Sequence, residues 1–174
     1  MGETQKLFSM QEELLALNKR TKNTIGIAQV IGSFGIAYQV SGELDKSLQY
    51  LMEARDIIKK VGEYQFSAVV ALWLGELFME MEDYAEAEKY FNECNSIYEK
   101  AEDMDAQLTG AFPALSKLYL KKGEIEKAKE LIERTCEYTT NRKIRLYRAE
   151  AEMLKAMLFR EQKNWEQSIQ HFEK

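Results

Sequence analysis

Histidine and cysteine, two residue types often used in catalysis and zinc binding, are scarce in this 174-residue chain. His171 is the single histidine, and no nucleophile or acid accompanies it in a triad-like pattern. Cys94 and Cys136 form no CxxC pair, and with His171 they do not have the spacing of zinc ligands. We therefore predict no catalytic residue, no metal site and no cofactor. We also predict a solvent-facing His171 and two buried free thiols, as in a reducing compartment.

Two charged segments could contact ligands. The acidic segment Glu102–Ala106 has neither the glycine nor the closing glutamate of a calcium loop, and acids at a helix start explain it better. The basic segment at 139–148 carries four cations and no acid: Arg142, Lys143, Arg145 and Arg148. Two interpretations stay open, a solvated loop balanced by nearby glutamates and a patch for an acidic partner.

Composition narrows the class of protein. The net charge of −5 argues against general nucleic-acid binding, which requires a cationic face. No apolar run approaches the ~20 residues needed to span a bilayer, and no secretory signal opens the chain. We therefore expect a cytoplasmic protein that binds neither nucleic acid nor membrane.

A repeat organises most of the chain. Small residues recur at spacings of 40, 41 and 40 positions, at Gly35, Gly75, Ser116 and Ala156. An aromatic residue follows each of them three positions later, at Tyr38, Phe78, Tyr119 and Phe159. Further small residues recur at Ser47, Ala87, Ala128 and Ser168, and large apolar ones at Leu51, Phe91, Ile132 and Phe172. A period of 20 to 50 residues indicates stacked structural repeats.

Each unit is predicted to be a pair of helices, because apolar residues recur every three or four positions between short breaks. The pairs are 24–41 with 44–62, 64–81 with 84–101, 104–121 with 125–140, and 143–162 with 165–174. Residues 3–21 form an unpaired helix, and residues 1–174 form a single array with repeats at 24–62, 64–101, 104–140 and a truncated 143–174. Pro113 predicts a bend in its helix or a helix that starts late.

The small residues explain a glycine at a costly position. A glycine inside a helix destabilises it by ~1 kcal/mol relative to alanine. We expect the small residue of the first helix to let the second helix of the same unit pack closely against it through its own small residue.

These residues resemble the tetratricopeptide repeat family, whose pattern is matched by Leu74, Gly75, Phe78, Ala87 and Phe91. The early tryptophan and the closing proline are absent, and the period exceeds the usual ~34 residues. Longer units of this kind resemble those of MalT-type regulators and Pins-type adaptors. The resemblance implies an all-α fold, a right-handed superhelical solenoid of antiparallel helix pairs.

In that family the first helix of each pair lines a concave, partner-binding face. The matching positions are Gln29, Ile36, Gln39, Val69, Leu72, Glu76, Met79, Lys117, Leu120, Glu150, Met153, Met157 and Arg160. The basic clamp with which some relatives hold chaperone tails is missing, because Gly32, Ile36, Leu72 and Glu76 occupy its places.

The resemblance implies a non-enzymatic scaffold that binds a protein or peptide in this groove. The alternative is a ligand- or partner-sensing segment of a larger signalling protein or transcription regulator. Because no polar capping helix closes the array after Phe172, we also expect a homodimer contact through the C-terminal end.

Overall fold

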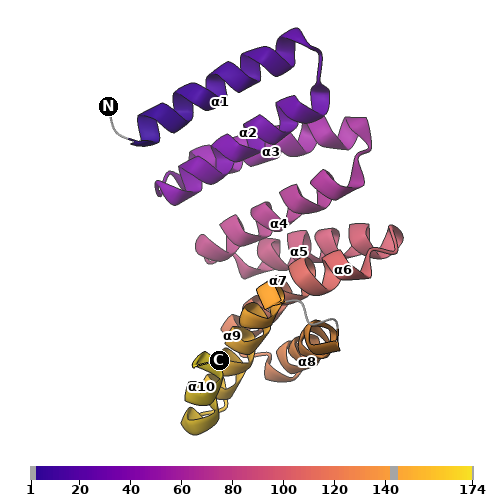
Figure 1. Cartoon of the computed structure of the whole chain (residues 1–174). Coiled ribbons are helices and arrows are strands. Elements are labelled where there is room, and N and C mark those ends of the chain that lie inside the picture. Colours follow the sequence, from indigo (N-terminus) through magenta and orange to yellow (C-terminus); the bar gives the residue numbers. More distant parts are fainter. Residues whose placement is uncertain (1–2, 142–144, 174) are drawn as a thin grey trace. The chain divides into compact units, whose positions relative to one another are not determined.

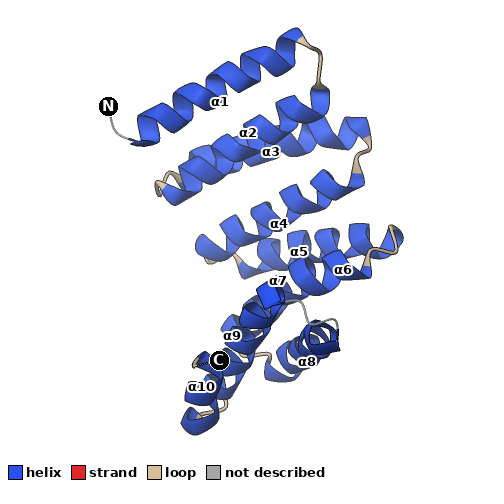
Figure 2. Ribbon diagram, in the orientation of Figure 1, coloured by secondary structure: helices blue, strands red, loops and turns tan. Residues whose placement is uncertain are grey.

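The computed structural model describes residues 3–141 and 145–173, and every regular element within them is helical (Figures 1 and 2). Within the first unit, Met1–Asp83, short turns join successive helices, so neighbouring helices run antiparallel. The helices are α1 (Glu3–Arg20), α2 (Thr24–Val40), α3 (Leu44–Val61), α4 (Tyr64–Glu80), α5 (Tyr84–Lys100), α6 (Met104–Ala106), the π-helix η1 (Gln107–Ala111), α7 (Phe112–Lys122), α8 (Ile125–Asn141), α9 (Arg145–Glu161) and α10 (Trp165–Phe172).

The prediction of an all-α fold built from helix pairs is confirmed. Most predicted boundaries lie within two residues of the observed ones. The chain divides into two compact units, Met1–Asp83 with α1 to α4 and Tyr84–Lys174 with α5 to α10. The division falls in the turn between α4 and α5, inside the second predicted repeat.

The turns repeat as regularly as the helices. Within the pairs, a residue with positive φ stands at Gly42, Glu82, Gly123 and Lys163. Its backbone N–H bonds the carbonyl three residues back, and the next N–H bonds the carbonyl five residues back. Those last carbonyls belong to the recurring aromatic residues Tyr38, Phe78, Tyr119 and Phe159. Each first helix therefore ends in a Schellman motif that satisfies its terminal carbonyls.

The turns between pairs follow the same 40-residue period. Positive φ occurs at Lys22, Gly62 and Glu102, each followed by the N-cap residue of the next helix. Those residues are Asn23, Glu63 and Asp103, and their side chains accept hydrogen bonds from free N–H groups of the first helical turn. These N-caps set where the first helix of each pair begins.

Gly35 confirms the close approach expected between the helices of a pair, but with a different neighbour. A Cβ built on Gly35 would lie 2.7 Å from Cγ of Leu51 and 3.3 Å from its backbone nitrogen. The residue that requires the glycine is thus the large Leu51 on α3, which is fully buried, rather than the small Ser47. In the second unit, an apolar core joins α7, α8 and α9 through Leu120, Ala128, Ile132, Ala151, Leu154 and Leu158.

The α-helix that contains Pro113 starts late, at Phe112, which is one of the two predicted outcomes, and a widened turn precedes it. The helical path begins at Met104, widens into the π-helix η1, and returns to α-geometry at Phe112. Phe112 N–H bonds the carbonyl of Gln107, five residues back. Pro113 lies in the first turn of α7, where the missing N–H of proline is tolerated.

Candidate binding surfaces

In the first unit, α2 and α4 are the first helices of their pairs, and together they form a wall. Gly32 lets them approach, because a Cβ there would lie 3.0 Å from the Trp73 ring and 3.4 Å from the Phe66 ring. Near the far end of α2, Gln39 Nε2 donates to Glu80 Oε2 at 2.9 Å. The wall is therefore held by aromatic packing at one end and a polar contact at the other.

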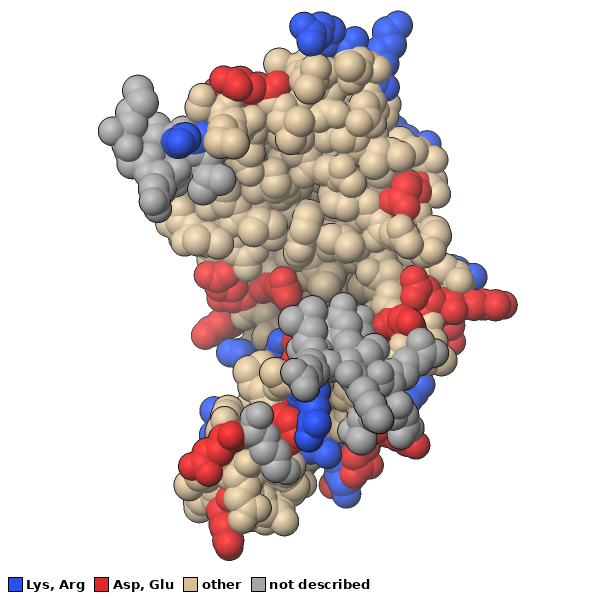
Figure 3. All heavy atoms as spheres, in the orientation of Figure 1, with Lys and Arg blue, Asp and Glu red and all other residues tan. Residues whose placement is uncertain are grey.

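The predicted groove residues of the first unit lie along this wall with partial exposure. Gln29 and Glu76 are exposed, whereas the predicted apolar contacts are half-buried: Ile36, Val69, Leu72 and Met79. Helix α2 contains no charged residue, and the only charged residues of α4 are Glu76 and Glu80. Figure 3 shows a broad surface with few charged atoms over the part of the chain that holds α1 to α4.

The equivalent wall of the second unit is formed by α7 and α9 and carries charge. Lys117 Nζ pairs with Glu150 Oε1 at 2.8 Å, so these two predicted contacts offset one another. Met153 is exposed, and Arg160 is exposed beside Glu161. Leu120, by contrast, is only 5% exposed in the core and offers no surface to a partner, and Met157 packs against the same core.

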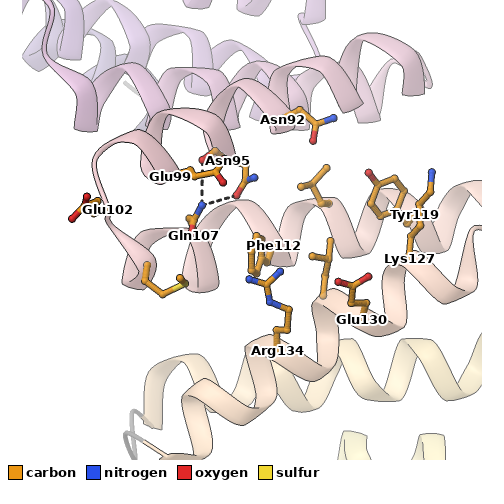
Figure 4. Close-up of a pocket in the computed structure, with 13 residues that line it drawn as sticks. Asn92, Asn95, Glu99, Glu102, Gln107, Phe112, Tyr119, Lys127, Glu130 and Arg134 are labelled. Atoms are coloured by element: carbon orange, nitrogen blue, oxygen red, sulfur yellow. Dashed lines mark hydrogen bonds between the residues drawn. The ribbon is translucent and has the colours of Figure 1, made fainter.

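A pocket of about 560 Å³ lies elsewhere in the second unit, between α5, α7 and α8 (Figure 4). Phe112, Leu115 and Tyr119 line it from a face of α7 different from the one that carries Lys117. Asn92 and Asn95 come from α5, and Lys127, Glu130, Leu131 and Arg134 come from α8. None of these lining residues was predicted as a site residue.

Two carboxamides in the pocket lining are hydrogen-bonded to each other. Gln107 is 6% exposed, and its Nε2 donates to Oδ1 of Asn95 at 3.2 Å and to the Asn95 carbonyl at 3.4 Å. Because a carbonyl only accepts, these contacts orient both amides. Gln107 opens the π-helix η1, and π-helical turns are frequent at functional sites.

Charged groups line other parts of the pocket. The Arg134 guanidinium lies 4.5 Å above the centre of the Phe112 ring, a cation–π contact. Lys127 pairs with Glu124 at 2.6 Å, outside the pocket lining. Glu99, Glu102 and Glu130 are exposed around the opening, so the carboxylates outnumber the cations.

A group of ion pairs links α5, α7 and the start of α8. Lys122 contacts both Glu88 and Glu124, and these hydrogen bonds raise the pKa of its ammonium group. Burial, followed by the charge of Glu88, raises the pKa of the Tyr119 phenol, which donates to Glu88 at 3.2 Å. The carboxyl pKa of Glu124 is lowered by its bonds to Lys122 and Lys127.

The single histidine and the two cysteines lie among other side chains of the protein. The prediction of a solvent-facing His171 is wrong: Nδ1 lies 2.6 Å from Glu152 Oε2, and the ring stacks on Phe159 at 5.3 Å. The sequence pattern missed this because Ser168, one turn earlier, carries α10 onto Ala156 of α9. Cys94 and Cys136 are buried and form no disulfide, as predicted. Among the described residues, no three His, Cys, Asp or Glu side chains gather as metal ligands would.

The basic segment cannot be assembled into a site. Arg142 and Lys143 lie outside the described residues, as does the side chain of Arg145, while Arg148 is exposed on α9.

The expected self-association through the C-terminal end stays a prediction. Helix α10 leaves three large apolar side chains more than half exposed: Trp165, Ile169 and Phe172. In the described part of the chain, no helix is both long and apolar enough to cross a membrane.

Comparison of the sequence with known families finds the tetratricopeptide repeat over residues 24–100, which correspond to α2 through α5. No curated protein matches the sequence. The fold is similar to that of BtubC (BKLC) from P. vanneervenii, with a TM-score of 0.82 and 15% identity over 99% of this chain and 71% of that protein.

Two further solved structures have the same kind of fold. One is a protein described as a kinesin light chain from P. anserina, with nearly identical TPR-like repeats; its TM-score is 0.72 at 16% identity, covering 99% of this chain and 85% of that one. The other is apo RapI, with a TM-score of 0.68 at 21% identity and 98% of this chain covered. This chain spans only 60% of RapI. At identities this low, the structural similarity shows the fold alone, which is a helical repeat of the tetratricopeptide type.

Proposed function

We propose that the chain is a non-enzymatic module that binds a partner protein, and that the wall formed by α2 and α4 is its main contact surface. The observation that carries this proposal is the composition of that wall. Two adjacent helices together carry no cation and only two acids, yet their apolar residues Ile36, Val69 and Leu72 keep part of their surface exposed. Apolar surface flanked by polar residues is typical of interaction sites.

The partner segment that fits this wall is a helix or peptide with an apolar face. Such a segment would cover the half-buried residues and gain ~25 cal/mol for each Å² of apolar surface removed from water. In the second unit, Lys117 and Glu150 already neutralise one another, so that wall offers polar contacts at the rim rather than apolar anchors. We therefore place the energetic centre of binding on the first unit.

A matched pair of variants tests the proposal. Leu72→Arg adds a charge to the wall, whereas Gln49→Arg adds the same charge to an exposed position of α3. We expect a partner captured by the wild-type protein to be lost with Leu72→Arg and kept with Gln49→Arg, while circular dichroism shows equal helical content. Equal capture by both variants would refute the assignment of the wall.

The second candidate is a regulatory segment in which binding changes the arrangement of the array. The division into two compact units at Asp83 favours it, as does the resemblance of the 40-residue units to those of MalT-type regulators and Pins-type adaptors. Small-angle neutron scattering distinguishes the two when the captured partner is deuterated and matched to the solvent, because the signal then comes from this chain alone. A change in the radius of gyration of the chain supports the regulatory segment, and an unchanged chain supports the passive scaffold.

A further inference from the structure

We infer that the pocket between α5, α7 and α8 is a second binding site, which takes an extended peptide segment with an apolar side chain between basic residues. The site lies wholly within the second unit and does not include the wall of α2 and α4. Three features of the pocket support it: its carboxamides, its apolar floor and its charge.

The carboxamide pair matches the backbone of an extended peptide. The bond between Gln107 and Asn95 uses one donor of Gln107 and the Oδ1 of Asn95. It leaves Oε1 of Gln107 as an acceptor and Nδ2 of Asn95 as a donor, one on each side of the bond. An extended peptide presents an N–H and a C=O that are both unpaired, whereas a helix has already paired its own.

Burial makes this pair more than a surface feature. Gln107 is 94% buried, and its carboxamide lines the pocket at the start of the π-helix η1. A polar group at such a position is costly unless it is hydrogen-bonded. The bond to Asn95 meets part of this requirement, and a peptide backbone, which offers both an N–H and a C=O, meets the rest.

The apolar part of the lining accepts a side chain next to that peptide bond. Phe112 and Leu115 of α7 are buried beneath the pocket, and Leu131 of α8 is half-buried at its wall. A pocket of about 560 Å³ has room for an apolar side chain and the adjoining peptide groups. Arg134, which lies over the Phe112 ring in Figure 4, closes one edge of this floor.

The charge of the opening selects the flanking residues. Three carboxylates, of Glu99, Glu102 and Glu130, line it against two cations. The charge of Lys127 is offset by Glu124, and the Arg134 guanidinium lies over the Phe112 ring. A peptide with lysine or arginine on either side of its apolar residue therefore gains attraction at both ends. A peptide with acids there is repelled.

The test uses synthetic peptides and the full chain. The probe is a blocked pentapeptide with leucine at its centre, threonine on both sides and lysine at both ends, since threonine favours an extended backbone. Binding is followed by NMR through the side-chain amide signals of Asn95 and Gln107. We expect these signals to shift and saturate. The affinity should fall about tenfold when alanine replaces leucine, and about twofold to tenfold when the leucine nitrogen is methylated.

Matched proteins and peptides complete the experiment. Leu131→Lys should abolish binding, while Glu126→Gln, an exposed change elsewhere on α8, should leave it unaltered. Glutamate in place of both lysines of the peptide should weaken binding about tenfold. Leu72→Arg should have no effect, which separates this site from the proposed function. Amide signals that do not shift, equal binding of the glutamate peptide, or no effect of N-methylation would each overturn the inference.

Discussion

The strongest test of the repeat as a physical unit concerns its turns. Glu82 has φ of 60° and occupies the position taken by Gly42 and Gly123 in the neighbouring pairs, where φ is 79° and 74°. Its side chain is exposed, and its N–H bonds the Met79 carbonyl, which glycine would do equally well. The substitution Glu82→Gly therefore keeps the turn and removes only the side chain.

The expected gain is the difference of two terms. A non-glycine residue in this left-handed region costs about 1–2 kcal/mol, and glycine costs about 0.4–1 kcal/mol through the greater freedom of the unfolded chain. Glu82→Gly should thus raise the free energy of unfolding by about 0.5–1 kcal/mol, or about 1–4 °C in melting temperature for a chain of this size. Gly42→Ala should lower it by a similar amount, since a Cβ there meets no atom within 4 Å.

Urea unfolding followed by circular dichroism measures both variants. Glu82→Ala is the control, because it removes the charge but keeps a Cβ in the left-handed region, and it should change stability little. A destabilised Glu82→Gly, or a gain for Glu82→Ala as large as that for Glu82→Gly, would show that backbone conformation does not determine the residue preference of these turns.

Three further predictions concern packing, pH and thiol reactivity. Gly35→Ala should lower the free energy of unfolding in urea by about 1–2 kcal/mol, because overpacking against Leu51 exceeds the helix-propensity gain of alanine; a stabilised variant would contradict this. Folding lowers the pKa of the Glu124 carboxyl group from its ordinary value of 4.5. The ionised group therefore stabilises the folded protein above pH 4.5, and this stabilisation is lost as the pH falls through the lowered pKa. Glu124→Gln should therefore lower the urea midpoint at neutral pH and flatten its decline below pH 4.5, whereas parallel curves would exclude the pair with Lys122. Burial raises the pKa of the Cys136 thiol, so a thiol reagent should modify it far more slowly in the native protein than in guanidinium, and equal rates would refute its burial.

The period and the helix boundaries were predictable because local signals repeat. Small and aromatic residues at matching positions, and breaks between apolar stretches, place eight of the helical segments within a few residues. The breaks between paired helices were recognised in all four units, but glycine alone signals a residue with positive φ, at Gly42 and Gly123. Charged residues in the same conformation, at Glu82 and Lys163, gave no sign because propensity disfavours them there.

Side-chain pairing and burial were harder to predict. The position of Leu120 in the repeat suggested the groove, but α9 packs over it and buries it in the core. His171 looked exposed because only α10 was considered, whereas its partners Glu152 and Phe159 lie on α9. Contacts of this kind depend on how two helices meet, and the pattern of one helix alone does not contain that information.

The pocket arises from the one irregularity of the repeat. The spacing of 41 residues between Gly75 and Ser116, against 40 elsewhere, means that one unit holds an extra residue. The turns place that residue within the first helix, because 21 positions separate Glu102 from Gly123 but 20 separate Gly62 from Glu82. A helix absorbs one extra residue by widening to a hydrogen bond five residues back, as Phe112 does to Gln107.

This insertion explains both the proline and the pocket. In the widened turn the regular bonding is already interrupted, so Pro113 just after it costs less than in a regular helix. The same turn presents Gln107 to Asn95 of α5, and this contact creates the carboxamide pair. The other repeats have no such turn among the described residues, and their equivalents of Gln107 are Ile27 and Ser67, which carry no carboxamide. The irregular spacing is thus the sequence signal that distinguishes the third unit from its neighbours, and it points to the residues that line its pocket.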